Sequence, residues 1–155
     1  MKKTVLVLIV DREKEKILLA YKKRGFGSGK LNGAGGKIES GETPVEAVVR
    51  ETEEEFGMQL KKTDLIDVGE CFFYFENRPE WNIHNKMFFA YRWSGEPAET
   101  EEMGKPEWFL FDTIPYEKMW ADDALWLPNV LAGKHIRAKF YFDKKGEKIL
   151  RHSIK

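Results

Sequence analysis

Hydrophobic and polar positions along the chain predict a mixed α/β protein. Apolar, β-branched runs over 4–10 and 17–21 flank a charged stretch, which is typical of two paired strands. Further strands are expected over 65–68, 70–75, 87–93 and 108–111, with a break at 77–80. The segments 135–142 and 148–154 enclose a turn sequence and predict a C-terminal hairpin.

One helix is marked clearly at both of its ends. Thr43 is a suitable N-cap, Pro44 suits the first helical position, and Glu46 completes a capping box. Gly57 supplies the stop. The pattern therefore predicts a helix between Thr43 and Gly57.

A second helix is expected over 124–132. Asp122 or Asp123 is the candidate N-cap, and Gly133 follows the last turn. Between the first strands and the first helix, the segment 22–37 carries six glycines, which indicates backbone conformations that other residues avoid.

Length and composition narrow the class of protein. The 155 residues predict a single domain spanning 1–155. Hydrophobic residues make up 42% and charged residues 34%, which disfavours a membrane protein and a disordered chain. The formal charge is zero, which argues against stable nucleic-acid binding through net charge. A monomer is expected, because no exposed apolar stripe marks a partner surface.

The N-terminus and the cysteine content favour a cytoplasmic location. Only six consecutive apolar residues precede Asp11, too few for a signal-peptide core or a membrane span. The single Cys71 lies in an apolar run and cannot form an intrachain disulfide, which fits a reducing compartment. We expect Cys71 to be buried.

The first helix separates into a packing face and an acidic face. At about 100° per residue, Val48, Thr52 and Phe56 fall on one side, while Glu51, Glu54 and Glu55 cluster on another. Three carboxylates at this spacing repel one another, so a positive group should compensate them. Oxygen ligands suit Mg²⁺, with Mn²⁺ as an alternative, and the absence of neighbouring His or Cys disfavours zinc. A solvated acidic face is the simpler alternative.

The residues around these three glutamates favour a metal site over a solvated acidic face. Their spacing resembles the Nudix box, the signature of hydrolases that act on nucleoside diphosphates linked to another moiety. The matching positions are Gly36, Glu42, Arg50, Glu51, Glu54, Glu55, Gly57 and the apolar Met58. One departure is Thr52, where the box has a bulky aliphatic residue. We expect the Thr52 hydroxyl to bond a backbone carbonyl beneath the helix.

The resemblance implies an α/β Nudix fold, a mixed β-sheet sandwiched between α-helices. It also implies that Glu51, Glu54 and Glu55 hold divalent ions with the Gly36 carbonyl, and that Arg50 orients a carboxylate. The general base varies within the superfamily, so Glu54, Glu55 and Glu102 all stay candidates. The chemistry implied is attack of water on a diphosphate phosphorus. Among the neighbouring cations of 22–24, Lys22 is a candidate for phosphate binding, with solvated surface as the alternative.

A narrower resemblance covers nearly the whole chain. The segments 22–37 and 115–123 look like those of the animal-type oxidised purine nucleoside triphosphatases, the 8-oxo-dGTP diphosphatases. By position, Asn32, Asp122 and Asp123 would bond the purine edge and Trp120 would stack on its face. Departures include a longer first hairpin at 11–16, Leu31 for a tryptophan, Ala34 for an aromatic residue, and a segment at 82–85 that aligns poorly.

Four further residues match positions that line the same pocket, with ordinary core packing as the alternative. These are Thr4, Phe73, Phe75 and Met103. For Asp122 the alternative is helix capping, and for Trp120 it is burial in the core.

The predicted function is Mg²⁺-dependent hydrolysis of oxidised purine nucleoside triphosphates, 8-oxo-dGTP and 2-oxo-dATP among them, to monophosphate and pyrophosphate. The expected partner is therefore a small-molecule nucleotide, and the cellular role is nucleotide-pool sanitation. One alternative is a Nudix hydrolase for a dinucleoside polyphosphate, ADP-ribose or an RNA 5′ end. The other is a non-catalytic nucleotide-sensing module, which the intact Glu51, Glu54 and Glu55 disfavour.

Overall fold

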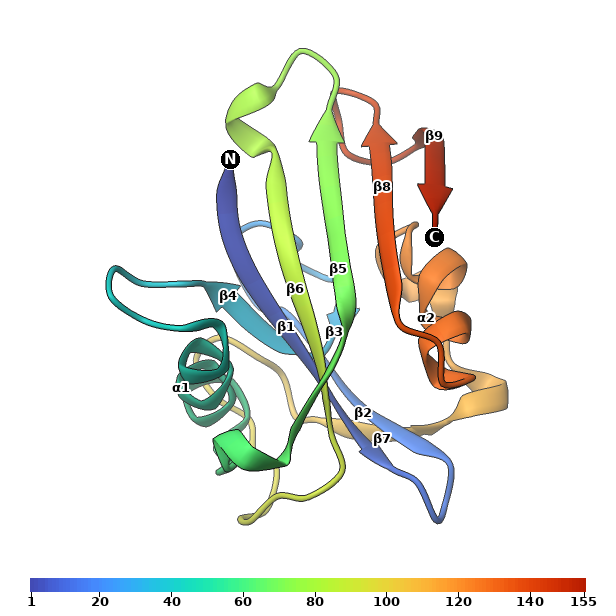
Figure 1. Cartoon of the computed structure of the whole chain (residues 1–155). Helices are drawn as coiled ribbons and strands as arrows, with labels where there is room; N and C mark the ends of the chain where they lie inside the picture. The colour runs from blue at the N-terminus through green and yellow to red at the C-terminus, as the bar shows by residue number, and fades with distance from the viewer.

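A computed structural model describes all residues, 1–155. Its centre is a nine-stranded mixed sheet that carries one helix on each face (Figure 1). The strands are β1 (Lys2–Asp11), β2 (Lys16–Tyr21), β3 (Leu31–Asn32), β4 (Ala34–Lys37), β5 (Leu65–Phe75), β6 (Ile83–Ala90), β7 (Glu107–Leu110), β8 (Ile136–Phe142) and β9 (Ile149–Ile154). The helices are α1 (Pro44–Phe56) and α2 (Asp123–Leu131).

Strand β1 organises the sheet. It pairs in parallel with β6 along one edge, whereas its other edge is shared between two partners. The first half of β1 pairs with β4, so that Val5 lies opposite Gly36, and the second half pairs with β2, so that Ile9 lies opposite Leu18. The sheet continues from β6 through β5 and β8 to β9.

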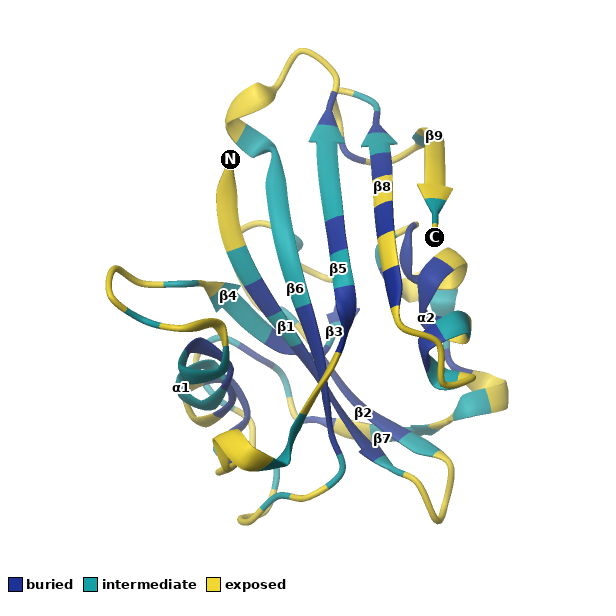
Figure 2. Ribbon diagram, in the orientation of Figure 1, coloured by how far each residue is buried: buried dark blue, intermediate teal, exposed yellow.

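The two faces of the sheet have separate hydrophobic cores. Alternate residues of β1 point to opposite sides, so Leu8 joins the core beneath α2 while Ile9 joins the core beneath α1. Strand β8 shows the same alternation of buried and exposed positions, and β9 at the edge is mostly exposed (Figure 2). Cys71 is fully buried in the α2-side core, as predicted.

Several expected boundaries need correction. The two predicted runs at 65–68 and 70–75 form one strand, β5, because Gly69 accommodates a bulge without ending the pairing. Strand β6 begins at Ile83 rather than at 87 and ends at Ala90 rather than at 93, because pairing with β1 and β5 sets its limits. The first hairpin, the helix over 44–56, the short strand near 108 and the C-terminal hairpin are confirmed. No helix has both the length and the apolar character to cross a membrane.

Candidate active site

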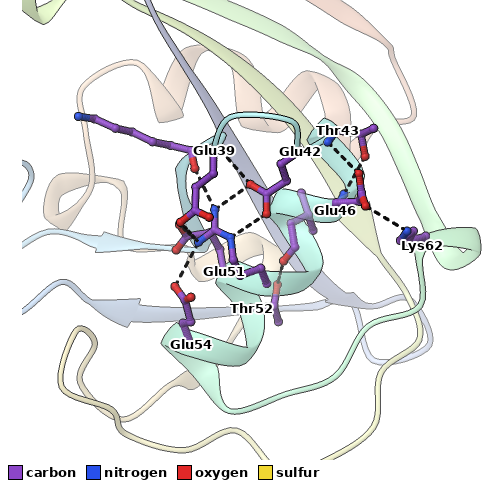
Figure 3. A network of polar contacts seen from close by, with 11 residues as sticks. Glu39, Glu42, Thr43, Glu46, Glu51, Thr52, Glu54 and Lys62 are labelled. Atoms are coloured by element: carbon purple, nitrogen blue, oxygen red, sulfur yellow. Dashed lines mark hydrogen bonds and ion pairs between the residues drawn. The ribbon is translucent and has the colours of Figure 1, made fainter.

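Helix α1 is held at its ends by the predicted groups. The Thr43 hydroxyl accepts from the amide of Glu46 at 3.2 Å, and the Glu46 carboxylate accepts from the amide of Thr43 at 2.9 Å (Figure 3). Gly57 ends the helix at φ 69°, a left-handed conformation that suits glycine. The buried Thr52 hydroxyl donates to the Val48 carbonyl at 2.7 Å, which confirms the expected local bond. The acidic residues are thus carried on a rigid element.

Arg50 connects the acidic residues of α1 to the preceding loop. Its guanidinium donates to both carboxylate oxygens of Glu42, at 2.8 and 3.0 Å, and to the Lys37 carbonyl at 3.0 Å. The same side chain donates to Glu51 at 2.9 Å and to Glu54 at 3.3 Å (Figure 3). The hydrogen bond from Arg50 lowers the pKa of Glu42 to about 2. Arg50 therefore compensates the charges of Glu51 and Glu54.

Two of the three glutamates lie against the glycines of β4. The Glu55 carboxylate accepts from the amide of Gly35 at 2.9 Å. The Glu51 carboxylate packs directly against Gly36, where an added Cβ would overlap it. Burial raises the pKa of Glu51, and burial likewise raises the pKa of Glu55 to about 7. Both carboxylates are thus partly dehydrated and gathered at one strand.

The carboxylates suit a hard divalent cation, although they do not form a closed cage. No group of three or more acidic, histidine or cysteine side chains converges on one point. Glu51 and Glu54 turn instead toward Arg50, and the Glu54 side chain is 54% exposed. The donors available are all oxygens, and the glycine at 36 leaves room only for the Glu51 carboxylate beside its backbone. The residues therefore fit Mg²⁺ or Mn²⁺.

The cations at 22–24 have different surroundings. Arg24 forms an ion pair with Glu102 at 2.6 Å, and Lys23 forms one with Glu99 at 2.5 Å. Lys22 lines the central cavity and has no carboxylate within ion-pair distance. Glu102 itself lies outside the cavity lining, and the hydrogen bond from Arg24 lowers its pKa. Of these residues, the structure brings only Lys22 to the cavity.

A cavity of about 180 Å³ extends from the carboxylate end of α1 to α2. Glu55 and Gly36 line one end of it, and Trp126 of α2 lines the other. All the residues predicted for the base pocket line this same cavity: Thr4, Asn32, Phe73, Phe75, Met103, Trp120, Asp122 and Asp123. Residues from distant parts of the sequence are therefore brought together as predicted, and their roles stay predictions.

The adjacent aspartates of α2 are almost completely buried. The indole N–H of Trp126 donates to the Asp122 carboxylate at 2.7 Å, and one Asp123 carboxylate oxygen has no hydrogen-bond partner. Burial raises the pKa of Asp122, while burial and the charge of Asp122 together raise the pKa of Asp123 well above its ordinary value. Both shifts favour the neutral form of these carboxyls, and a protonated carboxyl is a hydrogen-bond donor as well as an acceptor. A pair of this kind can both donate to and accept from a ligand.

The helix-capping alternative for Asp122 and Asp123 is wrong. Asp122 occupies the N-cap position, but its side chain makes no cap hydrogen bond and instead accepts from Trp126 one turn later. The reason is that burial beside the indole N–H offers the carboxylate a partner other than the helix amides.

Trp120 is part of an aromatic cluster that the sequence did not indicate. The ring of Phe26 lies 5.1 Å from that of Trp120, centroid to centroid, and makes edge contacts with Phe75 at 6.0 Å and Trp81 at 5.6 Å. Gly27 lies against the Trp120 indole, where a Cβ would be 3.1 Å from the ring nitrogen. The glycine-rich segment therefore brings an aromatic ring to the mouth of the cavity.

Comparison with known proteins decides the family. Residues 1–130 match the family model described as the NUDIX domain. The chain belongs to the Nudix family. The oxidized purine nucleoside triphosphate hydrolase of Danio rerio is 44% identical over 139 residues, which cover 89% of this chain and 86% of that protein. The protein of the same name from Mus musculus is 39% identical over 149 residues, covering 96% of this chain and 92% of that one.

Solved structures agree with this assignment. A crystal structure of the MutT protein from Bacillus halodurans matches with a TM-score of 0.84 at 25% identity, covering 99% of this chain and 97% of that one. The expected Nudix fold, a mixed sheet between two helices, is thus confirmed. The resemblance inferred from the box and from the segments at 22–37 and 115–123 is confirmed as well.

Phe26 and Asn85 are among the side chains of this Nudix cavity that sequence reasoning missed. Phe26 lies among the glycines of the segment 22–37, which predicted unusual backbone conformations but no aromatic ring in the cavity. Asn85 also lines the cavity, and it belongs to the segment at 82–85 that aligned poorly. Because the predicted start of β6 was four residues late, the side of the sheet that Asn85 faces was not assigned.

Proposed function

We propose that this Nudix protein hydrolyses oxidised purine nucleoside triphosphates, 8-oxo-dGTP and 2-oxo-dATP among them, to the monophosphate and pyrophosphate. The observation that carries the proposal is one cavity that is lined both by Glu55 of α1 and by the buried Asp122 and Asp123. The two relatives that match most of the chain carry this activity in their names. The resulting cellular role is the removal of mutagenic precursors from the nucleotide pool.

Glu51, Glu54 and Glu55, with the Gly36 carbonyl, are the groups that would hold Mg²⁺, or Mn²⁺ in its place. When bound, the cation neutralises charge on the diphosphate oxygens and lowers the pKa of the attacking water. Arg50 fixes the orientation of Glu51 and Glu54 through the two hydrogen bonds of its guanidinium. The Lys22 ammonium, free of carboxylate partners, is placed to meet the phosphates.

The proton of the attacking water needs an acceptor from the chain. Glu55 lines the cavity, and Glu54 lies on the same helix, exposed and in contact with Arg50, so both are candidates. Glu102 stays a candidate only if it leaves its ion pair with Arg24, since it does not line the cavity.

At the other end, Trp120 would stack on the purine face, while Asn32, Asp122 and Asp123 would bond its edge. An oxidised purine differs from its parent by an added carbonyl and a new ring N–H, on the imidazole ring in 8-oxoguanine and on the pyrimidine ring in 2-oxoadenine. The unpartnered oxygen of Asp123 supports this role, because a buried polar atom without a partner is rare in a finished core. A ligand that donates a hydrogen bond to this oxygen would supply the missing partner.

We further propose that the enzyme works as a monomer in the cytoplasm, acting on free nucleotides without stable nucleic-acid binding. The net charge is zero, and the only cysteine is a buried free thiol. Light scattering of the purified protein tests the oligomeric state, and filter binding to duplex and single-stranded DNA tests the lack of nucleic-acid affinity.

The proposed activity is tested by measuring pyrophosphate and monophosphate release with Mg²⁺. The substrates to compare by kcat/KM are 8-oxo-dGTP, 2-oxo-dATP, dGTP, ADP-ribose and a diadenosine polyphosphate, with chelator present as the control. A preference of about 10-fold or more for the oxidised purines, about 1.4 kcal/mol in the transition state, is expected. Preference for ADP-ribose or the dinucleotide would keep the Nudix chemistry and discard the base pocket. Absence of all turnover would leave a nucleotide-sensing module.

A further inference from the structure

The sheet forms an apolar floor beneath the cavity, and that floor contains two polar exceptions. Its side chains come from the face of β1, β5, β6 and β8 that packs toward α2. The apolar members of this floor are Leu6, Phe73, Phe75, Ile83, Met87 and Phe142. The polar exceptions are Thr4 on β1 and Asn85 on β6.

These two residues are partners across the sheet. Thr4 and Asn85 lie opposite each other in the parallel pairing of β1 with β6, and the Asn85 amide N–H donates to the Thr4 hydroxyl oxygen at 2.6 Å. A side-chain amide has two N–H donors and a carbonyl oxygen, and a hydroxyl has a donor as well. The Asn85 carbonyl oxygen and the Thr4 hydroxyl proton have no partner in the protein. The pair therefore offers the Asn85 carbonyl oxygen as an acceptor, and the Thr4 hydroxyl proton and the second Asn85 N–H as donors.

The free groups of the pair face the cavity and not the closed core. Thr4 and Asn85 are both partly exposed, and neither has a buried side-chain atom without a hydrogen-bond partner. A few polar groups among apolar lining side chains are typical of ligand pockets, where they fix the orientation of the ligand. A ligand in the cavity is therefore the natural partner for the free groups of Asn85 and Thr4.

The position of the pair lies between the two ends of the cavity. In the sheet, Thr4 is flanked by Lys37 of β4, which follows Gly36, and Asn85 is flanked by Cys71 of β5. Cys71 belongs to the same buried core as Trp126, whose indole N–H donates to Asp122. The pair thus lies between the carboxylate end and the aspartate end.

We propose that Asn85, together with Thr4, hydrogen-bonds a sugar hydroxyl of the nucleotide and is a specificity-determining residue of this enzyme. The inference rests on the proposed function, which assigns the phosphates to one end of the cavity and the base to the other. The sugar then lies over the middle of the floor. A hydroxyl both donates and accepts, which matches the acceptor of Asn85 and the donor of Thr4.

The test combines two isosteric variants with substrates that differ only in the sugar. Asn85→Leu and Thr4→Val, singly and together, are assayed by kcat/KM on 8-oxo-GTP, 8-oxo-dGTP and the 2′,3′-dideoxy analogue. If wild type prefers another nucleotide, the same three sugars are used on its base. Asn129→Ala is the matched control, since Asn129 is partly exposed on α2, lies outside the cavity lining, and its side chain bonds only the Leu125 carbonyl, at 3.5 Å.

The expected result is a loss of about 10-fold for Asn85→Leu on nucleotides that carry a hydroxyl, and less than about 3-fold on the dideoxy analogue. Because both residues serve one hydroxyl, the loss in the double variant should be smaller than the product of the single losses. Asn129→Ala should match wild type on all three substrates.

Two results would overturn the proposal: equal losses on all three sugars, or wild-type rates for Asn85→Leu throughout. Melting temperatures identify a variant that fails to fold, in which case Thr4→Val carries the same comparison. Failure of the proposed function is seen separately, as the absence of a preference for oxidised bases in wild type.

Discussion

The indole N–H of Trp126 donates to the carboxylate of Asp122 at 2.7 Å, one helical turn away and within the buried end of the cavity. This bond lowers the pKa of Asp122 against the larger rise that burial imposes. Trp126 therefore affects how the two aspartates share their protons. The arrangement makes a core tryptophan part of the electrostatics of the base pocket.

Trp126→Phe should destabilise the protein and weaken substrate binding. The variant keeps most of the ring packing but leaves the buried Asp122 carboxyl without its donor, at a cost of about 1–3 kcal/mol. The pKa of Asp122 should rise further. Urea denaturation and KM for 8-oxo-dGTP measure the two effects. Wild-type stability and KM together would show that the hydrogen bond has no role.

Asp123→Asn should change how stability depends on pH. Below the unfolded pKa of about 3.9, the carboxyl is protonated in both states. As pH rises through the raised folded pKa, the folded state binds more protons than the unfolded state, so wild type loses stability. Asparagine stays neutral at every pH. Between pH 4 and pH 8, the free energy of unfolding of wild type should therefore fall relative to that of the variant.

Urea denaturation of both proteins at pH 4, 6 and 8 provides this measurement. Glu55, whose pKa burial raises to about 7, contributes in the same direction in both proteins and therefore cancels in the difference. A difference that does not vary with pH would contradict the assignment of the raised pKa to Asp123.

Glu54→Gln should abolish turnover without unfolding the protein. Glu54 is half-exposed and contacts only Arg50, so its removal should change the free energy of unfolding by about 0.5 kcal/mol or less. We expect kcat to fall by about 100-fold or more, since one of the proposed metal ligands is lost. Glu53→Gln, on the exposed side of the same helix, is the matched control and should retain wild-type kcat. Equal rates in the two variants would remove Glu54 from the site.

Gly36→Ala should inactivate the enzyme through the position of Glu51. The added methyl group would overlap the Glu51 carboxylate, which has to move away from β4. Gly104→Ala is the control, because its Cβ would meet only ordinary contacts at 3.7 Å or more. Rates with Mg²⁺ and the apparent Mg²⁺ affinity are the measurements. A Gly36→Ala enzyme with unchanged Mg²⁺ dependence would show that Glu51 and Gly36 do not act together.

Arg50→Lys should lower both stability and activity despite keeping the charge. Lysine cannot reproduce the paired bonds to Glu42 or reach the Lys37 carbonyl at the same time. We expect a loss of about 1–3 kcal/mol in the free energy of unfolding. Thermal melting and kcat at saturating Mg²⁺ provide the check, and a Lys variant equal to wild type in both would refute the role of the planar guanidinium.

The sequence predicted those parts of the molecule whose signals are local. Thr43, Glu46 and Gly57 define α1 from both ends, and the structure reproduces each contact. The charged faces of α1 follow from helical periodicity in the same way. The limits of β6 depend instead on pairing with β1 and β5, which lie far away in the sequence, and the start of that strand was therefore missed.

The candidate site shows the same division. Arg50 and the glutamates were found through their spacing, and the pocket residues were found through resemblance to a family. Asn85 has neither signal, because its importance arises only when β6 is placed beside β1 and Thr4. Asp122 was ambiguous for a related reason, since a cap and a buried ligand group have the same sequence context until the indole of Trp126 is placed.

The division of one edge of β1 between β4 and β2 has a mechanical consequence. At this fork the cavity continues past the sheet, since it is lined by Glu55 from the helix on one face and by Trp126 from the helix on the other. A nucleotide that reaches both ends of the cavity would contact the protein on both sides of this fork. Amides of β4, including the Gly35 N–H that bonds Glu55, should then exchange with solvent more slowly when the nucleotide is bound. Bound substrate would thus restrain the sheet at the point where β1 changes partner from β4 to β2.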